Sequence, residues 1–335
     1  MDIDANYNDI AEEIGRLYGY HNLVGTLPVV PIRQGQYIGD VKYRKEVSKR
    51  LRTMGLNEVK TYTLVSEEMA GMFKYDNREN ILLPNPMSSD KSVIRTTLIP
   101  SLLNIYDYNK ARHVEDICLY EIAKTYDINY VEDTKVCIMV KGNYMGSSWI
   151  KESIKIDFYV LKGIICNLLD YMGFRNRYDF KVDTIKDMHP GMSARIILDR
   201  EEIGIIGRIH PNIKKDDIYI AELSLNKLIK TIKPIKYKEA TKYPEIIKDV
   251  SFIVDKNTTC KEISDQIKKS GGRILSNIEV FDVYKSDIKA SSVSLAFSLT
   301  FSDNTRTLTD EEVMQVFNKI IEEVTIKCNA KLNSI

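Results

Sequence analysis

The residues near the amino terminus with the clearest capacity for chemistry are acidic. Five carboxylates fall within the first 13 positions, at Asp2, Asp4, Asp9, Glu12 and Glu13. Carboxylate oxygens are preferred ligands of Mg²⁺, and the last three would meet at the start of one helix, so the cluster predicts a magnesium site. The same residues also suit a structural role, with Asp9 as a helix N-cap and Glu12 completing a capping box. Both interpretations remain open from these residues alone.

Other motifs that carry chemistry are missing or structural. The sequence has no glycine-rich phosphate loop, no G-x-S-x-G and no H-E-x-x-H. Two of its four histidines, His189 and His210, each precede a proline at a strand edge, which favours turn and packing roles over metal binding. Arg95 and Glu121 are predicted to form an ion pair within a sheet. The sequence therefore predicts no catalytic residue.

A basic segment follows at about residues 40–54. Val47, Leu51 and Met54 form an apolar stripe at helical spacing. Six cations surround that stripe, namely Lys42, Arg44, Lys45, Lys49, Arg50 and Arg52. We consider two interpretations of this predicted helix, a surface that binds RNA or a partner protein and an ordinary solvated helix face.

Composition places these residues in an ordinary globular protein. The 335 residues suit two domains, with 44% hydrophobic and 28% charged residues. The net charge of +1 excludes a global electrostatic field that attracts nucleic acid or an anionic membrane. No apolar run is long enough to span a bilayer. Five widely spaced cysteines without a C-x-x-C favour a reducing compartment, and hence a cytoplasmic location.

The elements that must position these residues fall into two regions. Ile10, Ile14, Leu17 and Tyr18 lie on one face of a short helix that Gly19 can end, and this segment has too little apolar surface for a core of its own. From about 40 to 230, short strands such as 59–65, 80–83, 117–123, 135–140, 195–198 and 203–209 alternate with helices, which predicts an antiparallel sheet with flanking helices. Residues 233–244 are charged and aperiodic, and we expect a domain boundary there.

The last region has the clearest order of elements. Predicted strands at 250–254, 278–284, 293–301 and 330–333 enclose two amphipathic helices. Thr259 with Glu262, and Thr309 with Glu312, form capping boxes at the starts of those helices. The order β-α-β-β-α-β predicts a ferredoxin-like domain, so the chain as a whole is assigned to the α+β class.

Ten stretches, taken together and in order, resemble the C-terminal part of the phenylalanyl-tRNA synthetase β subunit. They cover nearly the whole chain, and each is weak alone. The stretches are DIAEEIGRLYGYHNL (9–23), TYTLVS (61–66), NPMSSDKSVIRTTLIPSLL (85–103), LYEIAKTY (119–126), DFYVLKG (157–163), HPGMSA (189–194), IGIIGRIHP (203–211), YPEIIKDVSF (243–252), EVFDVY (279–284) and TLTDEEV (307–313).

The resemblance implies a division of the chain and a function. Residues 1–30 are similar to the end of a magnesium-binding module, and 31–39 to a linker. Residues 40–232 are similar to a non-catalytic domain with the class II synthetase fold, 233–241 to a second linker, and 242–335 to the ferredoxin-fold anticodon-binding domain. The family attaches phenylalanine to its tRNA using ATP and Mg²⁺, with the catalytic residues and ATP on an α subunit. The expected partners are therefore tRNA and the α subunit, in a dimer of αβ heterodimers.

The family resemblance also bears on the candidate site residues. Asp9, Glu12 and Glu13 match the second half of the family's magnesium motif, whereas Asp2 matches the first half only with one extra residue. The family's editing and N-terminal tRNA-binding domains have no counterpart here, which implies either a piece of a longer chain or a natural short form. Three departures, at Lys248, Lys285-Ser286 and Asn333, are each expected to weaken a tRNA contact.

Binding of tRNA by the last domain requires a local patch, because residues 236–335 contain 15 basic and 15 acidic side chains. The candidate cations are Lys268, Lys269, Arg273, Arg306 and Lys331. Stacking on Phe281 or Tyr284 is a further option, although strand alternation predicts that at least one of these rings lies in the core.

Three functional hypotheses follow. The favoured one is a non-catalytic part of phenylalanine–tRNA ligase that acts as a scaffold for α and as a tRNA-positioning arm. The second is a free-standing tRNA-binding or regulatory protein that reuses the same two domains. The third, an independent enzyme, requires a polar pocket with perturbed titratable groups in the middle domain.

Overall fold

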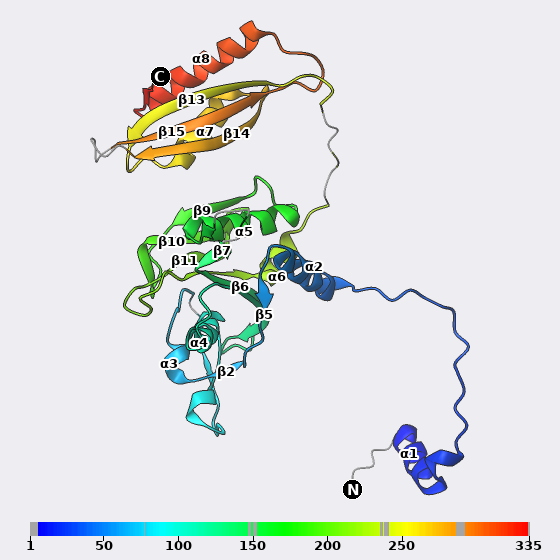
Figure 1. The fold of residues 1–335 in the computed structure, drawn as a ribbon. Helices are drawn as coiled ribbons and strands as arrows, with labels where there is room; N and C mark the ends of the chain where they lie inside the picture. Colours follow the sequence, from blue (N-terminus) through cyan, green and yellow to red (C-terminus); the bar gives the residue numbers. More distant parts are fainter. Residues whose placement is uncertain are drawn as a thin grey trace. The chain divides into compact units, whose positions relative to one another are not determined.

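The computed structural model describes residues 6–76, 78–146, 149, 153–234, 237, 241–285 and 292–333. The chain divides into two compact units, Met1–Pro234 and Ile235–Ile335, and each is described by itself. Figure 1 shows both units as layered arrangements of helices and strands. In the described residues, no helix is both long and apolar enough to cross a membrane.

The first unit is built on a seven-stranded sheet with the order β1-β5-β6-β12-β11-β10-β9. All neighbouring strands are antiparallel except β1 and β5, which are parallel. The strands are β1 (Asn57–Glu58), β5 (Ile117–Tyr126), β6 (Glu132–Lys141), β9 (Tyr178–Val182), β10 (Met188–Leu198), β11 (Glu201–Ile209) and β12 (Tyr219–Ser224). The predicted antiparallel sheet with flanking helices is confirmed.

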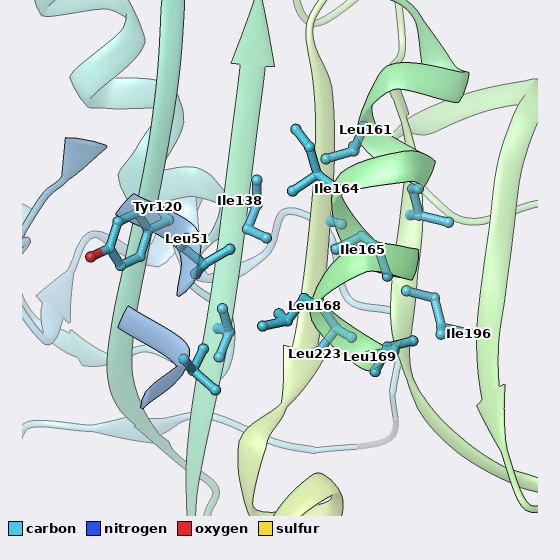
Figure 2. Close-up of a cluster of buried hydrophobic side chains, with 14 of the residues drawn as sticks. Leu51, Tyr120, Ile138, Leu161, Ile164, Ile165, Leu168, Leu169, Ile196 and Leu223 are labelled. Atoms are coloured by element: carbon cyan, nitrogen blue, oxygen red, sulfur yellow. The ribbon is translucent and has the colours of Figure 1, made fainter. Parts of the chain in front are cut away.

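Apolar side chains cover both faces of this sheet. On one face lie α2 (Gly39–Thr53) and α5 (Phe158–Tyr171), and Figure 2 shows α5 packed along the strands through Leu161, Ile165 and Leu168. The other face is covered by α4 (Ile99–Lys110). Because helices bury both faces, the central strands read as nearly continuous apolar runs.

Smaller elements complete the first unit. They are α1 (Tyr7–Tyr18), η1 (Tyr20–Asn22), β2 (Leu64–Val65), α3 (Glu67–Ala70), β3 (Ile81–Leu82), η2 (Ser89–Lys91), β4 (Val93–Ile94), β7 (Asn143–Met145), β8 (Ile154–Lys155) and α6 (Leu225–Thr231). The prediction of one strand over residues 59–65 is wrong. Val59 donates to the carbonyl of Tyr120 and Thr63 accepts from the N–H of Arg95, as strand residues would. Between them the N–H of Thr61 donates to the carboxylate of Glu121 at 3.0 Å, so a side chain interrupts the backbone pairing and only Leu64–Val65 of this stretch forms a strand.

The second unit has the predicted order of elements. They are β13 (Ile246–Asp255), α7 (Cys260–Gly271), β14 (Leu275–Lys285), β15 (Ser292–Phe301), α8 (Asp310–Lys327) and β16 (Lys331–Leu332). The sheet order is β14-β15-β13-β16, with every neighbouring pair antiparallel. Both predicted capping boxes are present, at Thr259 with Glu262 and at Thr309 with Glu312. The ferredoxin-like prediction is confirmed.

Candidate nucleic-acid interface

The second unit buries only one face of its sheet. Phe252, Phe297 and Leu299 lie on that face and pack against Ile263 of α7 and Val313 of α8. Strand residues alternate between faces, so their neighbours Ser251, Ala296 and Ser298 project from the opposite face. In the described part of this unit no helix lies on that second face, which we call the open face.

A β-bulge in β14 decides which side chains reach the open face. Val280 pairs with Phe297 and Asp282 with Ala296, which leaves Phe281 as an extra residue. Such an insertion reverses the alternation of the residues that follow. Asp282 and Tyr284 therefore share the open face with Ala296 and Ser294, their partners on β15.

This bulge corrects the prediction that Phe281 or Tyr284 lies in the core. Both rings are exposed, with 57% and 62% of their surface accessible. The prediction assumed unbroken alternation, in which two positions three residues apart must face opposite sides. The extra residue removes that parity, so both aromatic rings are available to a ligand.

A groove of about 530 Å³ runs over the open face and around the edge of the sheet next to β16. Its floor carries small polar side chains, with the hydroxyls of Ser251 and Ser294 2.9 Å apart. The backbone N–H of Asn333 donates to the carbonyl of Ser251 at 2.9 Å, and its side-chain amide donates to the Ser294 hydroxyl at 3.5 Å. The lining residues are Asp249, Val250, Ser251, Phe281, Asp282, Tyr284, Ser294, Ala296, Phe317, Ile321, Leu332 and Asn333.

The chemistry of the groove suits an unstacked nucleic-acid base better than a phosphate. Among the described residues that line it, the charged ones are Asp249 and Asp282, which would repel phosphate but can accept hydrogen bonds from base N–H groups. Exposed aromatic rings such as Tyr284 offer stacking surfaces to single-stranded bases. The small floor residues leave room for a planar ring.

The cations predicted from sequence do not line this groove. Lys268 and Lys269 lie in the last turn of α7, and Arg273 follows that helix. The guanidinium of Arg306 bonds the carboxylate of Glu312 at 2.7 Å. Lys331 pairs with Ile253 and therefore lies on the open face, outside the groove lining. The five cations thus do not form one patch around the groove.

The predicted magnesium ligands fall on and before α1. Asn6 caps this helix by accepting from the N–H of Asn8, so the alternative role of Asp9 as N-cap is wrong. Asp9, Glu12 and Glu13 lie within the first two turns of the helix, and the carboxylate of Glu13 pairs with Arg16. Asp2 lies outside the described residues, among which no group of three His, Cys, Asp or Glu side chains is placed to hold a metal ion.

In the first unit, buried charged side chains bind other groups of the same unit. Glu222 is fully buried and accepts from Lys135 at 2.8 Å, Tyr75 at 2.5 Å and the N–H of Leu98 at 2.6 Å. Burial opposes its ionisation, but the ammonium of Lys135 and these hydrogen bonds outweigh burial and lower its pKa. Burial and the neighbouring carboxylate raise the pKa of Tyr75 well above its usual value.

A second buried pair and a polar pocket lie in the same unit. Arg95 and Glu121 form the predicted ion pair at 3.2 Å. A pocket of about 350 Å³ is lined partly by Arg78, Lys135 and Lys227. Arg78 binds Asp76, Lys135 binds Glu222, and Lys227 donates to the carbonyl of Glu202. These cations are therefore held by the protein itself.

Two histidines bind the backbone two residues further along the chain. His210 has the predicted turn role, because its Nδ1 accepts from the N–H of Asn212 at 3.2 Å in the turn that follows β11. His189 lies within β10, where its Nδ1 accepts from the N–H of Gly191 at 3.1 Å beside an irregularity in the strand register.

Sequence reasoning missed most of the groove, including Asp282, Ser294 and Ser251. The sequence feature that could have indicated these residues is the alternation of small and large apolar residues along β15. The edge strand β14, which carries Phe281 and Tyr284, adds to it. That pattern indicates an uncovered sheet face, but it does not locate the bulge.

Two family models match the chain. The "Phenylalanyl tRNA synthetase beta chain CLM domain" matches residues 23–225, and the "Ferredoxin-fold anticodon binding domain" matches residues 241–333. Together they cover both units.

Curated relatives agree with these models. The phenylalanine–tRNA ligase β subunit of Geobacillus kaustophilus is 36% identical over 97% of this chain and 42% of the relative. The Bacillus subtilis β subunit is 34% identical over 94% of this chain and 40% of the relative. The chain thus spans about two fifths of the length of these relatives. A pyrrolysyl-tRNA synthetase structure from Desulfitobacterium hafniense gives a TM-score of 0.44 at 14% identity over 57% of this chain and 68% of that one, which is too low to support an argument.

Proposed function

The chain belongs to the family of phenylalanyl-tRNA synthetase β chains, and we propose that it serves as a non-catalytic, tRNA-binding part of phenylalanine–tRNA ligase. In this proposal the first unit is a scaffold for a catalytic α subunit, and the second unit binds unpaired bases of the tRNA. ATP is used by the α subunit. The observation that carries the tRNA role is the groove on the open face, with Tyr284, Phe281 and Asp282 presented by the bulge.

The scaffold role rests on the first unit. Two of its buried ion pairs, Arg95 with Glu121 and Lys135 with Glu222, bind charged side chains to one another. Exposed apolar side chains at Tyr62, Leu82 and Met87 belong to the small β2-β4-β3 sheet and the loop beside it, where they suit contact with a partner subunit. We include an α subunit, and an assembly of two αβ heterodimers, in the proposal.

The second unit contributes through position rather than chemistry. Attachment of an amino acid to the tRNA 3′ end requires that end to be held next to the activated amino acid. A distant contact that fixes the tRNA reduces the entropic cost of this arrangement. The open face would supply such a contact without taking part in bond formation.

The predicted magnesium ion does not fit as a complete site. Asp9, Glu12 and Glu13 supply oxygen ligands from one helix, but Glu13 is paired with Arg16, and the described residues offer no set of three ligands around one point. We derive no step through this ion. A cytoplasmic location is part of the same proposal, because phenylalanine–tRNA ligase serves protein synthesis.

The test uses the chain co-expressed with the α subunit of the same organism. Tyr284→Ala should raise KM for tRNA with kcat unchanged, because a contact made equally in the ground and transition states changes only binding. Loss of one base-stacking platform is worth about 1–3 kcal/mol, or about 5- to 140-fold in affinity. Tyr284→Phe retains the ring and should stay near wild type.

A matched control is Tyr159→Ala, which removes a tyrosine ring that is 73% exposed on the first unit. If Tyr284→Ala and Tyr159→Ala gave the same KM for tRNA, the groove would not be the tRNA site. If the chain failed to associate with α but bound tRNA alone, the free-standing RNA-binding protein would replace the ligase subunit. The names of the curated relatives do not favour that alternative.

A further inference from the structure

The polar pocket of the first unit lies at one end of its sheet, where β12 leads into α6 and where β6 and β11 begin. Its volume is about 350 Å³, near the lower end of the range of small-molecule sites. The described residues that line it all belong to the first unit, so it is separate from the groove of the second unit. We call it the α6 pocket.

Charged side chains of both signs line the α6 pocket. Among the described residues four are acidic and four are basic, so the pocket has no net attraction for phosphate or nucleic acid. Three of the cations, Arg78, Lys135 and Lys227, are held by acidic side chains of the same unit. Three of the carboxylates are held in the same way, in pairs of Asp76 with Arg78, Glu132 with Lys124 and Glu202 with Arg195.

The two remaining charges, one of each sign, have no oppositely charged partner among the described residues. The ammonium of Lys230 takes part in neither an ion pair nor a hydrogen bond there. The carboxylate of Asp133 accepts only from the hydroxyl of Ser224, at 2.7 Å. Because these two side chains do not pair with each other either, the pocket offers one carboxylate and one ammonium to a ligand.

The packing of α6 against β6 brings both unpaired charges to the same pocket. The side-chain amide of Asn226 donates to the carbonyl of Glu132 at 3.3 Å, which holds this face of α6 against the start of β6. Lys230 comes four residues after Asn226 and therefore lies on the same helix face. Asp133 follows Glu132 on β6, and its bond to Ser224 joins it to the N-cap residue of α6.

We propose that the α6 pocket binds a free α-amino acid in its zwitterionic form. The carboxylate of Asp133 accepts from the ammonium group of the ligand, and the ammonium of Lys230 donates to its carboxylate. A purely cationic or purely anionic ligand would leave one of these two groups without a partner. The proposal does not depend on tRNA binding by the second unit.

The apolar part of the lining indicates the kind of side chain that fits. Val131 and Ile203 present aliphatic groups to the pocket, and 56% of the surface of Val131 is exposed. Contact with a ligand would remove this apolar surface from water, which favours binding. An aliphatic amino acid such as leucine is therefore the first probe.

The experiment titrates the full chain with related small molecules, followed by saturation-transfer NMR, which measures weak affinities. L-leucine carries both charges, isoamylamine is leucine without the carboxylate, and isocaproate is leucine without the ammonium group. Leucine should bind about 5- to 12-fold more tightly than either analogue, a difference between that of an exposed ion pair and that of a charge-assisted hydrogen bond. Equal affinities for the three probes would contradict recognition of a zwitterion.

Two variants assign the contacts. Asp133→Asn removes the charge and retains an oxygen that accepts from Ser224, so it should weaken leucine and isoamylamine about 5- to 12-fold but not isocaproate. Lys230→Gln keeps a good helix former and should weaken leucine and isocaproate but not isoamylamine. A merely structural effect would change the affinities for all three probes together, and that result would reject the assignment.

The control variants are Lys181→Gln on β9 and Glu322→Gln on α8, which remove one exposed charge of each sign outside the α6 pocket. Both should bind leucine as the wild type does. If they weakened leucine as much as the pocket variants, net charge would explain the effect and the proposal would fail. No binding of either leucine or glycine, whose zwitterion has no side chain that could be excluded, at millimolar concentrations would also overturn the proposal.

Discussion

Replacing Lys135 by methionine tests whether buried charges hold the first unit together. The side chains of Lys135 and Glu222 have 2% and 0% of their surface exposed, and their charged atoms are 2.8 Å apart. Methionine retains the length of the lysine stem but removes the ammonium. Glu222 would keep its hydrogen bonds from Tyr75, Thr97 and Leu98, but no cation would balance its charge.

The expected loss of unfolding free energy is about 3–5 kcal/mol, the usual cost of leaving one buried partner uncompensated. In a region of about 200 residues each kcal/mol lowers Tm by about 2–4 °C, so the first unit should melt about 6–20 °C lower. Removing an exposed lysine, as in Lys124→Met, breaks only a surface pair with Glu132 and should cost less than about 1 kcal/mol.

The pH dependence has a definite sign. In the wild type the pKa of Glu222 is lowered, so its contribution is present above its unfolded value and is lost as the pH falls through the folded value. Without the ammonium, burial dominates and raises the pKa of the carboxyl group. The stability gap between wild type and Lys135→Met should therefore widen as the pH rises from about 4.3, the unfolded value, to 7.

The assay is urea unfolding at several pH values, with hydrogen exchange by mass spectrometry to assign the change to residues 40–234. A double variant, Lys135→Met with Glu222→Gln, removes both charges and should recover part of the loss and show little pH dependence. A single variant within 0.5 kcal/mol of wild type, or a loss that does not change with pH, would refute the idea that Glu222 is a buried, ionised group.

Three shorter predictions concern other sites. The Arg306 guanidinium beside Glu312 lowers the pKa of that carboxyl to about 2, so its contribution to stability should be lost as the pH falls from 4.5 to about 2, and thermal melts of Glu312→Gln should lack that dependence. Gly204→Ala would place a Cβ 2.1 Å from the carbonyl of Glu222 and should destabilise the sheet by about 1–3 kcal/mol in urea unfolding, whereas Gly163→Ala, on an open helix surface, should not. Burial raises the pKa of Cys118 to about 11, so a thiol reagent at pH 8 should label it far more slowly in the folded than in the unfolded chain, and equal rates would contradict its burial.

Periodicity predicted the elements that depend on an apolar stripe or on hydrogen bonds between sequence neighbours. The stripes of α5 and α8 and the capping boxes at Thr259 and Thr309 need only their own neighbours in sequence, and all are present. Residues 59–63 could not be assigned correctly, because Thr61 binds Glu121, which lies 60 positions away. Long-range hydrogen bonds to side chains leave no periodic signal, so such segments look like strands from composition alone.

In the candidate site, too, sequence periodicity failed where a local irregularity decides which way the side chains face. Sequence supplied the ferredoxin-like order and both aromatic residues of the FDVY stretch, but alternation assigned Phe281 and Tyr284 to opposite faces. A bulge adds one residue without changing the composition of the strand, and it reverses every side chain beyond it. Asp282 would otherwise pair with Leu295 on the buried face, where an unpaired carboxylate is costly. The polar character of Asp282 therefore favours the bulged register, and the alternation in this strand is best read in two segments that meet at Phe281.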